Sequence, residues 1–386
     1  MNPPAAVHPP APQRILVRGV NWLGDAVMTT PALQRLREAA PSARITLLTH
    51  AKLAPLWQRH PAIDDVITFS DRDNILALAR KLRAEHFDTA LVLPSSPRSA
   101  LEVFLAGIPR RIGLAGSLRR WLINEPVAPP PDLRRMRKRS PAEIRQLTHS
   151  ATGGNPRAEE TIYRPQDHQI HHYLHLAAAL GASTEPVAPR LEVSDAEVAA
   201  VRQRFGFSSA SGTPIFGLNP GAEYGPAKRW LRESFIAAAI EIQRRTGCRW
   251  WIFGGSADES VAGEIARAIA EARSGPAESV RSLAGQTNLR ELCAALKACR
   301  FVLTNDTGPM HIAAAVGTRV IVPFGSTSAA LTGPGIPNDT RHCFIEASVP
   351  CAPCFLRECP IDFRCMKSIT VETIVEAALH SASSLE

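Results

Sequence analysis

The sequence predicts an α/β protein built from two doubly wound domains that face each other across a cleft. Its 386 residues exceed the roughly 100–200 that one domain usually contains. Short apolar runs alternate with segments of helical periodicity, which is the pattern of parallel strands joined by crossover helices. The same pattern recurs in the second half of the chain. We therefore expect domains at 14–188 and 189–386.

Each predicted strand is a short apolar run bounded by turn residues or by a helical segment. In the first domain these runs are 14–19, 43–50, 66–69 and 89–94. Helical periodicity begins after Gly24 and recurs at 74–85 and 168–182. In the second domain the runs are 213–221, 248–255, 300–306 and 319–325. Helices are predicted there at 234–247, where Gly247 is a C-cap, and at 289–299 and 309–317.

Composition excludes several classes of protein. Hydrophobic residues make up 45% of the chain and charged residues 21%, which argues against wholesale disorder or a fibre. No stretch approaches the roughly 18 uncharged apolar residues that a membrane span needs. Residues 1–13 contain five prolines and lack the charged start and apolar core of a secretory signal. They predict a disordered tail on a protein that stays in the cytoplasm.

The charge balance predicts an anionic partner. Lys and Arg number 44 against 36 Asp and Glu, a net charge of +8, which suits a nucleotide, a nucleic acid or an acidic membrane surface. Five cations lie within a Pro-rich insertion at 129–165, namely Arg134, Arg135, Arg137, Lys138 and Arg139. This run is either a solvated loop or a binding surface. Because the chain lacks an RNP motif, interleaved aromatic residues and a helix-turn-helix, we expect no nucleic-acid partner.

The loop after the first predicted strand carries a candidate catalytic carboxylate. Gly19 and Gly24 allow a tight turn, and Asp25 falls at the start of the next helix. Asp25 is either the N-cap of that helix or a general base. The loop lacks a complete GxGxxG pattern, so a nicotinamide cofactor, and with it a dehydrogenase, is weakly supported.

Two loops of the second domain carry candidate ligand-binding residues. In the loop 219–230, Lys228 could place its charge on a phosphate. The alternative is an exposed lysine at a helix start, which the helix dipole disfavours. In the loop 253–260, Gly254 and Gly255 permit close approach of a ring or a sugar, although a plain strand-to-helix turn would look similar.

The segment 304–317 contains the most informative loop. Asp306, Thr307 and Gly308 form a turn, and Pro309 suits the first turn of a helix. The N–H groups at such a helix start attract anions. His311 lies one turn further and either faces the bound group or is an ordinary buried histidine, and Asp306 could equally be a cap.

Together the segments NWLGDAVMTTPAL, NPGAEYGPAKRW, LAGQTNLRELCAALKAC and TNDTGPMHIAAAVG resemble the ADP-heptose:lipopolysaccharide heptosyltransferases of glycosyltransferase family 9. The resemblance runs from about residue 14 to about 334, and the form PGAEYGPAKRW is most similar to the type II enzymes. It implies a GT-B fold of two Rossmann-like domains. It also implies inverting transfer of L-glycero-D-manno-heptose from ADP-heptose to heptosyl-Kdo2-lipid A, with no catalytic metal or other cofactor. A type I enzyme, which uses the Kdo acceptor, and another nucleotide-sugar enzyme such as an epimerase are the alternatives.

The resemblance also implies roles for the donor-side residues. Asp25 would be the general base, and Lys228 would stabilise the departing diphosphate. Thr307 and Gly308 would contact that diphosphate, Asp306 would hold heptose hydroxyls, and His311 would support them. The residues expected beside the adenosine are Gly254, Gly255 and Ser256. No acidic residue matches the family's ribose contact clearly, because Ala257 and Asp258 align ambiguously.

The first domain is the expected acceptor-binding domain, and the second the ADP-heptose-binding domain. Candidate acceptor contacts are Asn21, Trp22 and Arg98, although Trp22 could equally be a packing residue. Because the acceptor is anionic and lies in the inner membrane, the 134–139 run is expected to hold the enzyme peripherally on the cytoplasmic face.

Eight cysteines all lie after residue 247. Four of them are spaced as Cys351-x2-Cys354-x4-Cys359-x5-Cys365. Disulfides are not expected in a cytosolic chain, so these residues are either thiolate ligands of a structural metal or free thiols packed under the C-terminal tail. The spacing differs from that of common zinc motifs and favours free thiols.

Overall fold

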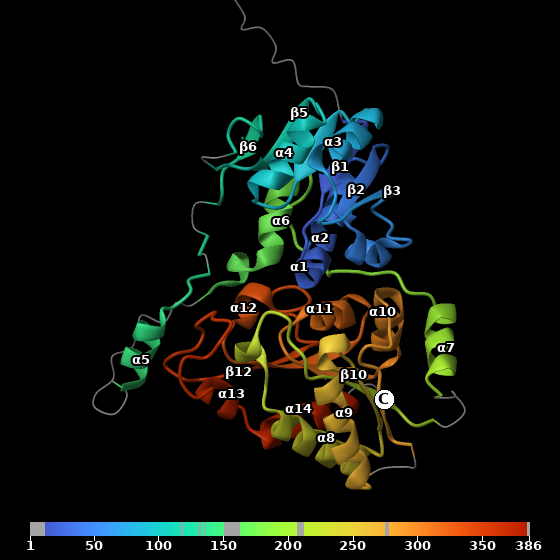
Figure 1. Ribbon diagram of the computed structural model, residues 1–386, viewed down its shortest axis with the longest axis vertical. Coiled ribbons are helices and arrows are strands. Elements are labelled where there is room, and N and C mark those ends of the chain that lie inside the picture. Colours follow the sequence, from blue (N-terminus) through green and yellow to red (C-terminus); the bar gives the residue numbers. More distant parts are fainter. Residues whose placement is uncertain are drawn as a thin grey trace, which may run out of the picture. The chain divides into compact units, whose positions relative to one another are not determined.

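The computed structural model describes residues 12–116, 119–130, 133–134, 136–149, 163–206, 212–274 and 278–383. Most of the predicted tail, residues 1–11, and Arg135 of the basic run lie outside these ranges. The described chain contains two six-stranded parallel sheets covered by helices (Figure 1). The predicted α/β class is therefore confirmed.

The first sheet has the strand order β3-β2-β1-β4-β5-β6, the order of dinucleotide-binding folds. Its strands are β1 (Arg14–Arg18), β2 (Arg44–His50), β3 (Asp65–Phe69), β4 (Thr89–Val92), β5 (Arg110–Leu114) and β6 (Glu125–Val127). The accompanying helices are α2 (Thr30–Ala39), the 3₁₀ segment η1 (Ala51–Trp57), α3 (Ile75–Ala84), α4 (Pro97–Leu105) and α6 (Gln169–Ala178).

Alternation along the strands builds the core of the first sheet. Leu16 and Val92 point to one face, where they pack with Leu82 of α3 and Val103 of α4. Side-chain caps fix where these two helices begin, because Asn74 accepts a hydrogen bond from the Leu76 N–H and Ser96 caps α4. Such caps satisfy donors that the first helical turn leaves unpaired.

The second sheet has the order β12-β11-β10-β7-β8-β9, which repeats the topology of the first. Its strands are β7 (Ile215–Asn219), β8 (Arg249–Ile252), β9 (Val280–Ser282), β10 (Phe301–Thr304), β11 (Arg319–Phe324) and β12 (Cys343–Glu346). The helices are α7 (Asp195–Arg204), α8 (Arg232–Thr246), α9 (Glu259–Glu271), α10 (Leu289–Ala298), α11 (Gly308–Ala315), α12 (Ala329–Thr332), α13 (Arg364–Lys367) and α14 (Val371–Ser383). Three 3₁₀ segments accompany them, η3 (Pro165–Asp167), η5 (Pro226–Lys228) and η6 (Ser256–Asp258).

One face of the second sheet carries a large aromatic and aliphatic core. Phe216 and Trp250 pack there with Phe235 of α8, Ile265 of α9 and Ile374 of α14. The predicted C-cap is confirmed, because Gly247 ends α8 in the left-handed conformation with φ +64°. Glycine adopts this conformation without the strain that other residues incur.

The chain divides into two compact units whose boundaries differ from the expected ones. Unit 1 contains Met1–Asn21, Thr29–Pro131 and Ile170–Pro186, and unit 2 contains Trp22–Met28, Asp132–Gln169 and Val187–Glu386. The helix α1 (Leu23–Met28) and most of the basic insertion therefore group with the second sheet, although the sequence pattern placed both in the first domain. They do so because α1 packs on α11 and the insertion is bonded to the Cys-rich segment, as described below.

Several elements carry no clear sequence signal. The strands β5, β6, β9 and β12 were not predicted, because short strands at or next to a sheet edge need no continuous apolar run. The Pro-rich insertion at 129–165, for which the sequence predicts no helix, contains the helix α5 (Pro141–His149). Only Ile144 of that helix is buried. Within the described ranges, no helix has both the length and the apolar character required to cross a membrane.

Candidate active site

A buried ion pair lies at the carboxyl end of the second sheet. Lys228 follows β7 and Asp306 follows β10, and the Lys228 Nζ lies 2.6 Å from the Asp306 Oδ2. Thr327, which follows β11, donates its hydroxyl to the same carboxylate oxygen at 2.7 Å. Asp306 is 4% exposed and the Lys228 side chain 15%. Lys228 is thus not a freely exposed lysine, and Asp306 is not a helix cap, because Thr307 occupies the cap position of α11.

Asn305 fixes the two loops that supply this pair. Its side chain is fully buried, accepts from the Trp230 N–H at 2.9 Å and donates to the Pro220 carbonyl at 2.8 Å. These bonds tie the loop after β7 to the loop after β10. Sequence reasoning overlooked both Asn305 and Thr327. An asparagine directly after a buried strand was a readable signal, whereas nothing in the sequence marks Thr327.

The start of α11 directly follows Asp306 of the ion pair. Thr307 at its cap position makes no side-chain capping bond, and Pro309 lies in the first turn, as predicted. The first N–H groups of such a helix are donors that attract an anion. His311 is 5% exposed. Burial lowers the pKa of His311 to about 4, against the opposing influence of Asp306, so its imidazole is neutral at pH 7.

Two glycines bring α1 against this helix. A Cβ added at Gly24 would lie 2.7 Å from the His311 Cδ2, and one added at Gly308 would lie 2.6 Å from the Leu23 Cδ2. Both distances are shorter than real Cβ contacts allow. Asp25 is the third residue of α1 and follows Gly24 directly. It is therefore not the N-cap of that helix, and the packing of α1 brings it to the same part of unit 2 as His311.

The glycines after β8 make room for a carboxylate. The Gly255 N–H donates to the Asp258 Oδ2 at 3.0 Å. A Cβ on Gly254 would lie 2.7 Å from the Asp258 Cβ, and one on Gly221 would lie 2.6 Å from the Asp258 Oδ2. In this structure the turn at Gly254, Gly255 and Ser256 thus provides a hydrogen-bond donor and space for the Asp258 side chain.

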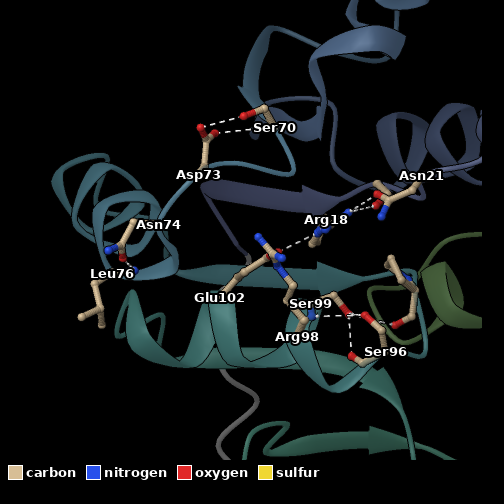
Figure 2. Close-up of polar contacts among 12 residues, drawn as sticks. Arg18, Asn21, Ser70, Asp73, Asn74, Leu76, Ser96, Arg98, Ser99 and Glu102 are labelled. Atoms are coloured by element: carbon tan, nitrogen blue, oxygen red, sulfur yellow. Dashed lines mark hydrogen bonds and ion pairs between the residues drawn. The ribbon is translucent and has the colours of Figure 1, made fainter.

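Two of the three candidate acceptor residues share a polar network in unit 1 (Figure 2). Arg18 donates to the Glu102 Oε2 at 2.8 Å and to the Asn21 Oδ1 at 3.0 Å. Arg98 lies 3.5 Å from the other Glu102 oxygen. The Arg18 and Glu102 side chains are 2% and 0% exposed, whereas Arg98 is half exposed. Trp22, also half exposed, belongs to unit 2 and not to this network.

The four closely spaced cysteines form no disulfide bonds. Cys351, Cys354 and Cys365 are buried, and the Phe363 N–H donates to the Cys359 Sγ at 3.3 Å. Burial, reinforced by the neighbouring cysteines, raises the pKa of Cys365 to about 12. Cys351 and Cys354 pack against Ile144 of α5. Among the described residues, no three His, Cys, Asp or Glu side chains are grouped to hold a metal ion.

Comparison with known proteins shows the family of this chain. Residues 75–363 match the model of glycosyltransferase family 9 (heptosyltransferase). The chain is 30% identical to lipopolysaccharide heptosyltransferase 2 of Escherichia coli K12 over 329 residues, covering 83% of this chain and 85% of that protein. It is 32% identical to lipooligosaccharide heptosyltransferase 2 of Haemophilus influenzae over 328 residues, with the same coverage.

A solved structure shows the same fold. The structure of E. coli ADP-heptose LPS heptosyltransferase II matches 96% of this chain and 100% of that one, with 26% identity and a TM-score of 0.74. The predicted GT-B fold and the predicted family are therefore confirmed. The chain belongs to glycosyltransferase family 9, the heptosyltransferases.

Proposed function

We propose that this glycosyltransferase transfers L-glycero-D-manno-heptose from ADP-heptose to heptosyl-Kdo2-lipid A, with inversion at the anomeric carbon. The observation that carries the proposal is the Lys228–Asp306 pair beside the start of α11, with α1 and its Asp25 packed on the same helix. A cation and unpaired N–H groups suit a diphosphate. The neighbouring carboxylates suit sugar hydroxyls and a proton acceptor. The names of the relatives agree with this donor and with the type II acceptor.

In the proposed reaction, Asp25 accepts the proton of an acceptor hydroxyl. The acceptor oxygen forms a bond to the anomeric carbon while the bond from that carbon to the diphosphate oxygen breaks. The electron pair of the broken bond leaves with ADP. Lys228 and the first N–H groups of α11 at Thr307 and Gly308 stabilise the charge that grows on the diphosphate, which is preorganised electrostatic stabilisation. His311, buried and neutral on the same helix, supports these contacts.

Further residues contact the heptose, the adenosine and the acceptor in this proposal. Asp306 holds heptose hydroxyls with one oxygen while Lys228 and Thr327 fix the other. The adenosine adjoins the turn at 254–256. On the acceptor side, Asn21 and Arg98 contact the inner core. The buried Arg18–Glu102 pair links these two residues, because Arg18 bonds to Asn21 and Glu102 lies beside Arg98. Trp22 stacks on a sugar of the acceptor.

The experiment that tests the reaction measures ADP release from ADP-L-glycero-D-manno-heptose with two acceptors. Turnover with heptosyl-Kdo2-lipid A alone is the expected result. Turnover with Kdo2-lipid A would instead assign a type I activity. If ADP stabilises the protein against heat but neither acceptor supports turnover, the assignment of heptose transfer to this acceptor is wrong.

Asp25→Asn tests the assignment of the general base. The variant should lose about 10²–10⁴-fold in turnover, because that is what a positioned base contributes. Its affinity for ADP should stay close to that of the unmodified protein, because the substitution changes little volume and the proposal gives Asp25 no contact with ADP. Asp195→Asn, at a fully exposed carboxylate of α7, is the matched control and should change neither quantity. A rate within about threefold of the unmodified protein would exclude Asp25 as the base.

We also propose that the protein binds peripherally to the cytoplasmic face of the inner membrane through the 134–139 run. Arg134 and Arg137 are exposed, and a cation near an anionic lipid surface contributes about 1 kcal/mol of binding free energy. The acceptor lies in that membrane, so this attachment would bring enzyme and acceptor together.

A further inference from the structure

Three cations surround the ring of Tyr224, next to the proposed catalytic pair. The Lys228 Nζ lies 5.0 Å from the ring centroid, the Arg357 Cζ 5.0 Å and the Lys138 Nζ 5.9 Å. These distances fall within the range of cation–π attraction. The three residues come from different segments, the loop after β7, the Cys-rich segment and the basic insertion. They are called the Tyr224 cluster below.

Hydrogen bonds hold the three segments together. The Arg357 carbonyl accepts from the Ala227 N–H at 3.0 Å, and the Tyr224 hydroxyl donates to the Phe355 carbonyl at 3.2 Å. These bonds join the Cys-rich segment to the loop that carries Lys228. Gly225, with φ +157°, allows this contact, because a Cβ there would overlap the Arg357 carbonyl oxygen.

The basic insertion is attached to the other side of the Cys-rich segment. The Arg139 N–H donates to the Cys354 carbonyl at 3.1 Å, and its guanidinium donates to the Pro350 carbonyl at 2.7 Å. Ile144 adds apolar contact with Cys351 and Cys354. Lys138 directly precedes Arg139, so these contacts fix the point from which it reaches Tyr224.

Among the described residues, an ion pair balances one of the three charges of the cluster and leaves two without a carboxylate partner. Lys228 pairs with Asp306. Lys138 and Arg357 are exposed, and among the described residues neither has a carboxylate oxygen within 4 Å. The cluster therefore holds three positive charges and one ion-paired carboxylate. Like charges held close together repel one another, and an anion bound among them removes that repulsion.

We propose that Lys138 and Arg357 complete, with Lys228, a cationic subsite for the diphosphate of the nucleotide donor. This inference rests on the proposed function, in which the donor is a nucleoside diphosphate sugar. Lys228 and the start of α11 contact the diphosphate from one side, and Lys138 and Arg357 add positive charge from the side of Tyr224. The basic insertion and the Cys-rich segment thus each deliver one cation to the donor site.

The test is ADP binding to the full chain, measured by calorimetry, with Lys138→Gln and Arg357→Gln. Each variant should weaken ADP binding about three- to tenfold, somewhat more than an exposed ion pair contributes, and should reduce the salt dependence of the affinity. Adenosine binding should be unchanged, because adenosine carries no phosphate. The matched controls Lys367→Gln and Arg364→Gln remove cations of the adjoining segment that lie outside the cluster, and they should bind ADP like the unmodified protein.

Three results would overturn the inference in distinguishable ways. If both cluster variants bind ADP normally but raise the acceptor KM, these cations serve an acceptor anion and the diphosphate subsite is wrong. If the controls weaken ADP binding as much as the cluster variants, only net charge matters. If the unmodified protein does not bind ADP, the proposed function and the inference both fail. If the unmodified protein does bind ADP, a negative result for the variants concerns only the role of the cluster.

Discussion

At the scale of single residues, burial decides what each charged side chain can do. Arg18 and Glu102 are almost completely removed from solvent, and the Arg18 Nε lies 2.8 Å from the Glu102 Oε2. The Arg18 guanidinium also lies 4.3 Å from the centroid of the Phe69 ring. A buried pair of this kind contributes little net stability compared with apolar residues, but removal of one partner leaves an uncompensated charge in the interior.

Glu102→Ala should therefore be strongly destabilising. We expect a loss of about 3–5 kcal/mol in the free energy of unfolding, because Arg18 would remain buried without its carboxylate. Denaturant unfolding of the full chain measures this quantity. Glu85→Ala is the control, because Glu85 pairs with Arg14 at 3.4 Å while both side chains are at least 40% exposed; it should cost less than about 1 kcal/mol. Equal losses in the two variants would contradict this account.

At the scale of elements, the approach of α1 to α11 is the packing contact on which the proposed site depends. It requires Gly24 against the His311 ring and Gly308 against Leu23. The first contact positions the residue before Asp25, and the second brings Leu23 against the start of α11, the proposed diphosphate site. One helix contact thus supports both the proposed base and the proposed diphosphate site.

Gly24→Ala should disturb both stability and turnover. Its Cβ has no space beside His311, so we expect a cost of about 1–3 kcal/mol from overpacking and reduced turnover as Asp25 shifts. Thermal unfolding and the ADP-release assay measure the two effects. Gly263→Ala provides the opposite case, because Gly263 lies inside α9 and a Cβ there meets nothing within 4 Å. That variant should gain about 0.5–1 kcal/mol. A neutral Gly24→Ala would show that α1 is not fixed by this contact.

At the scale of the whole molecule, the net charge of +8 is unevenly distributed. For binding to an anionic surface, the position of each cation therefore matters more than the total charge. Some cations of the basic run are used internally, since Arg139 binds the Pro350 carbonyl and Lys138 reaches Tyr224. Arg137 pairs with Glu143 at 2.9 Å yet remains largely exposed. Arg134 and Arg137 are thus the described members of the run that can meet an anionic surface.

The double variant Arg134→Gln/Arg137→Gln should bind anionic vesicles more weakly than the unmodified protein. We expect binding to vesicles with about one-third anionic lipid, none to neutral vesicles, and loss of binding at high salt through screening. Cosedimentation measures the bound fraction. Arg244→Gln/Arg245→Gln removes the same charge from α8, where both arginines pair with Glu241, and should leave binding unchanged. Equal weakening in both variants would make the effect one of net charge alone.

The sequence by itself determined most of the architecture. Apolar runs and helical periodicity predicted eight of the twelve strands in the described ranges, because central strands of a parallel sheet are buried on both faces and must be apolar. It could not predict β6, β9 or β12, because an edge strand can be short and half exposed. The candidate site residues Lys228, Asp306, Thr307 and His311 were predicted because they follow strands whose ends meet at one edge of a sheet.

Only the tertiary structure decided which of these residues pair and which segments join the site. The Lys228–Asp306 pair spans 78 residues, and Thr327 completes it from a third loop. The structure also moved α1 and the basic insertion into unit 2 and placed Lys138, Lys228 and Arg357 around one tyrosine. The physical reason is that periodicity records which face of an element is buried, whereas the partner of a charged side chain is set by contacts between segments far apart in the chain.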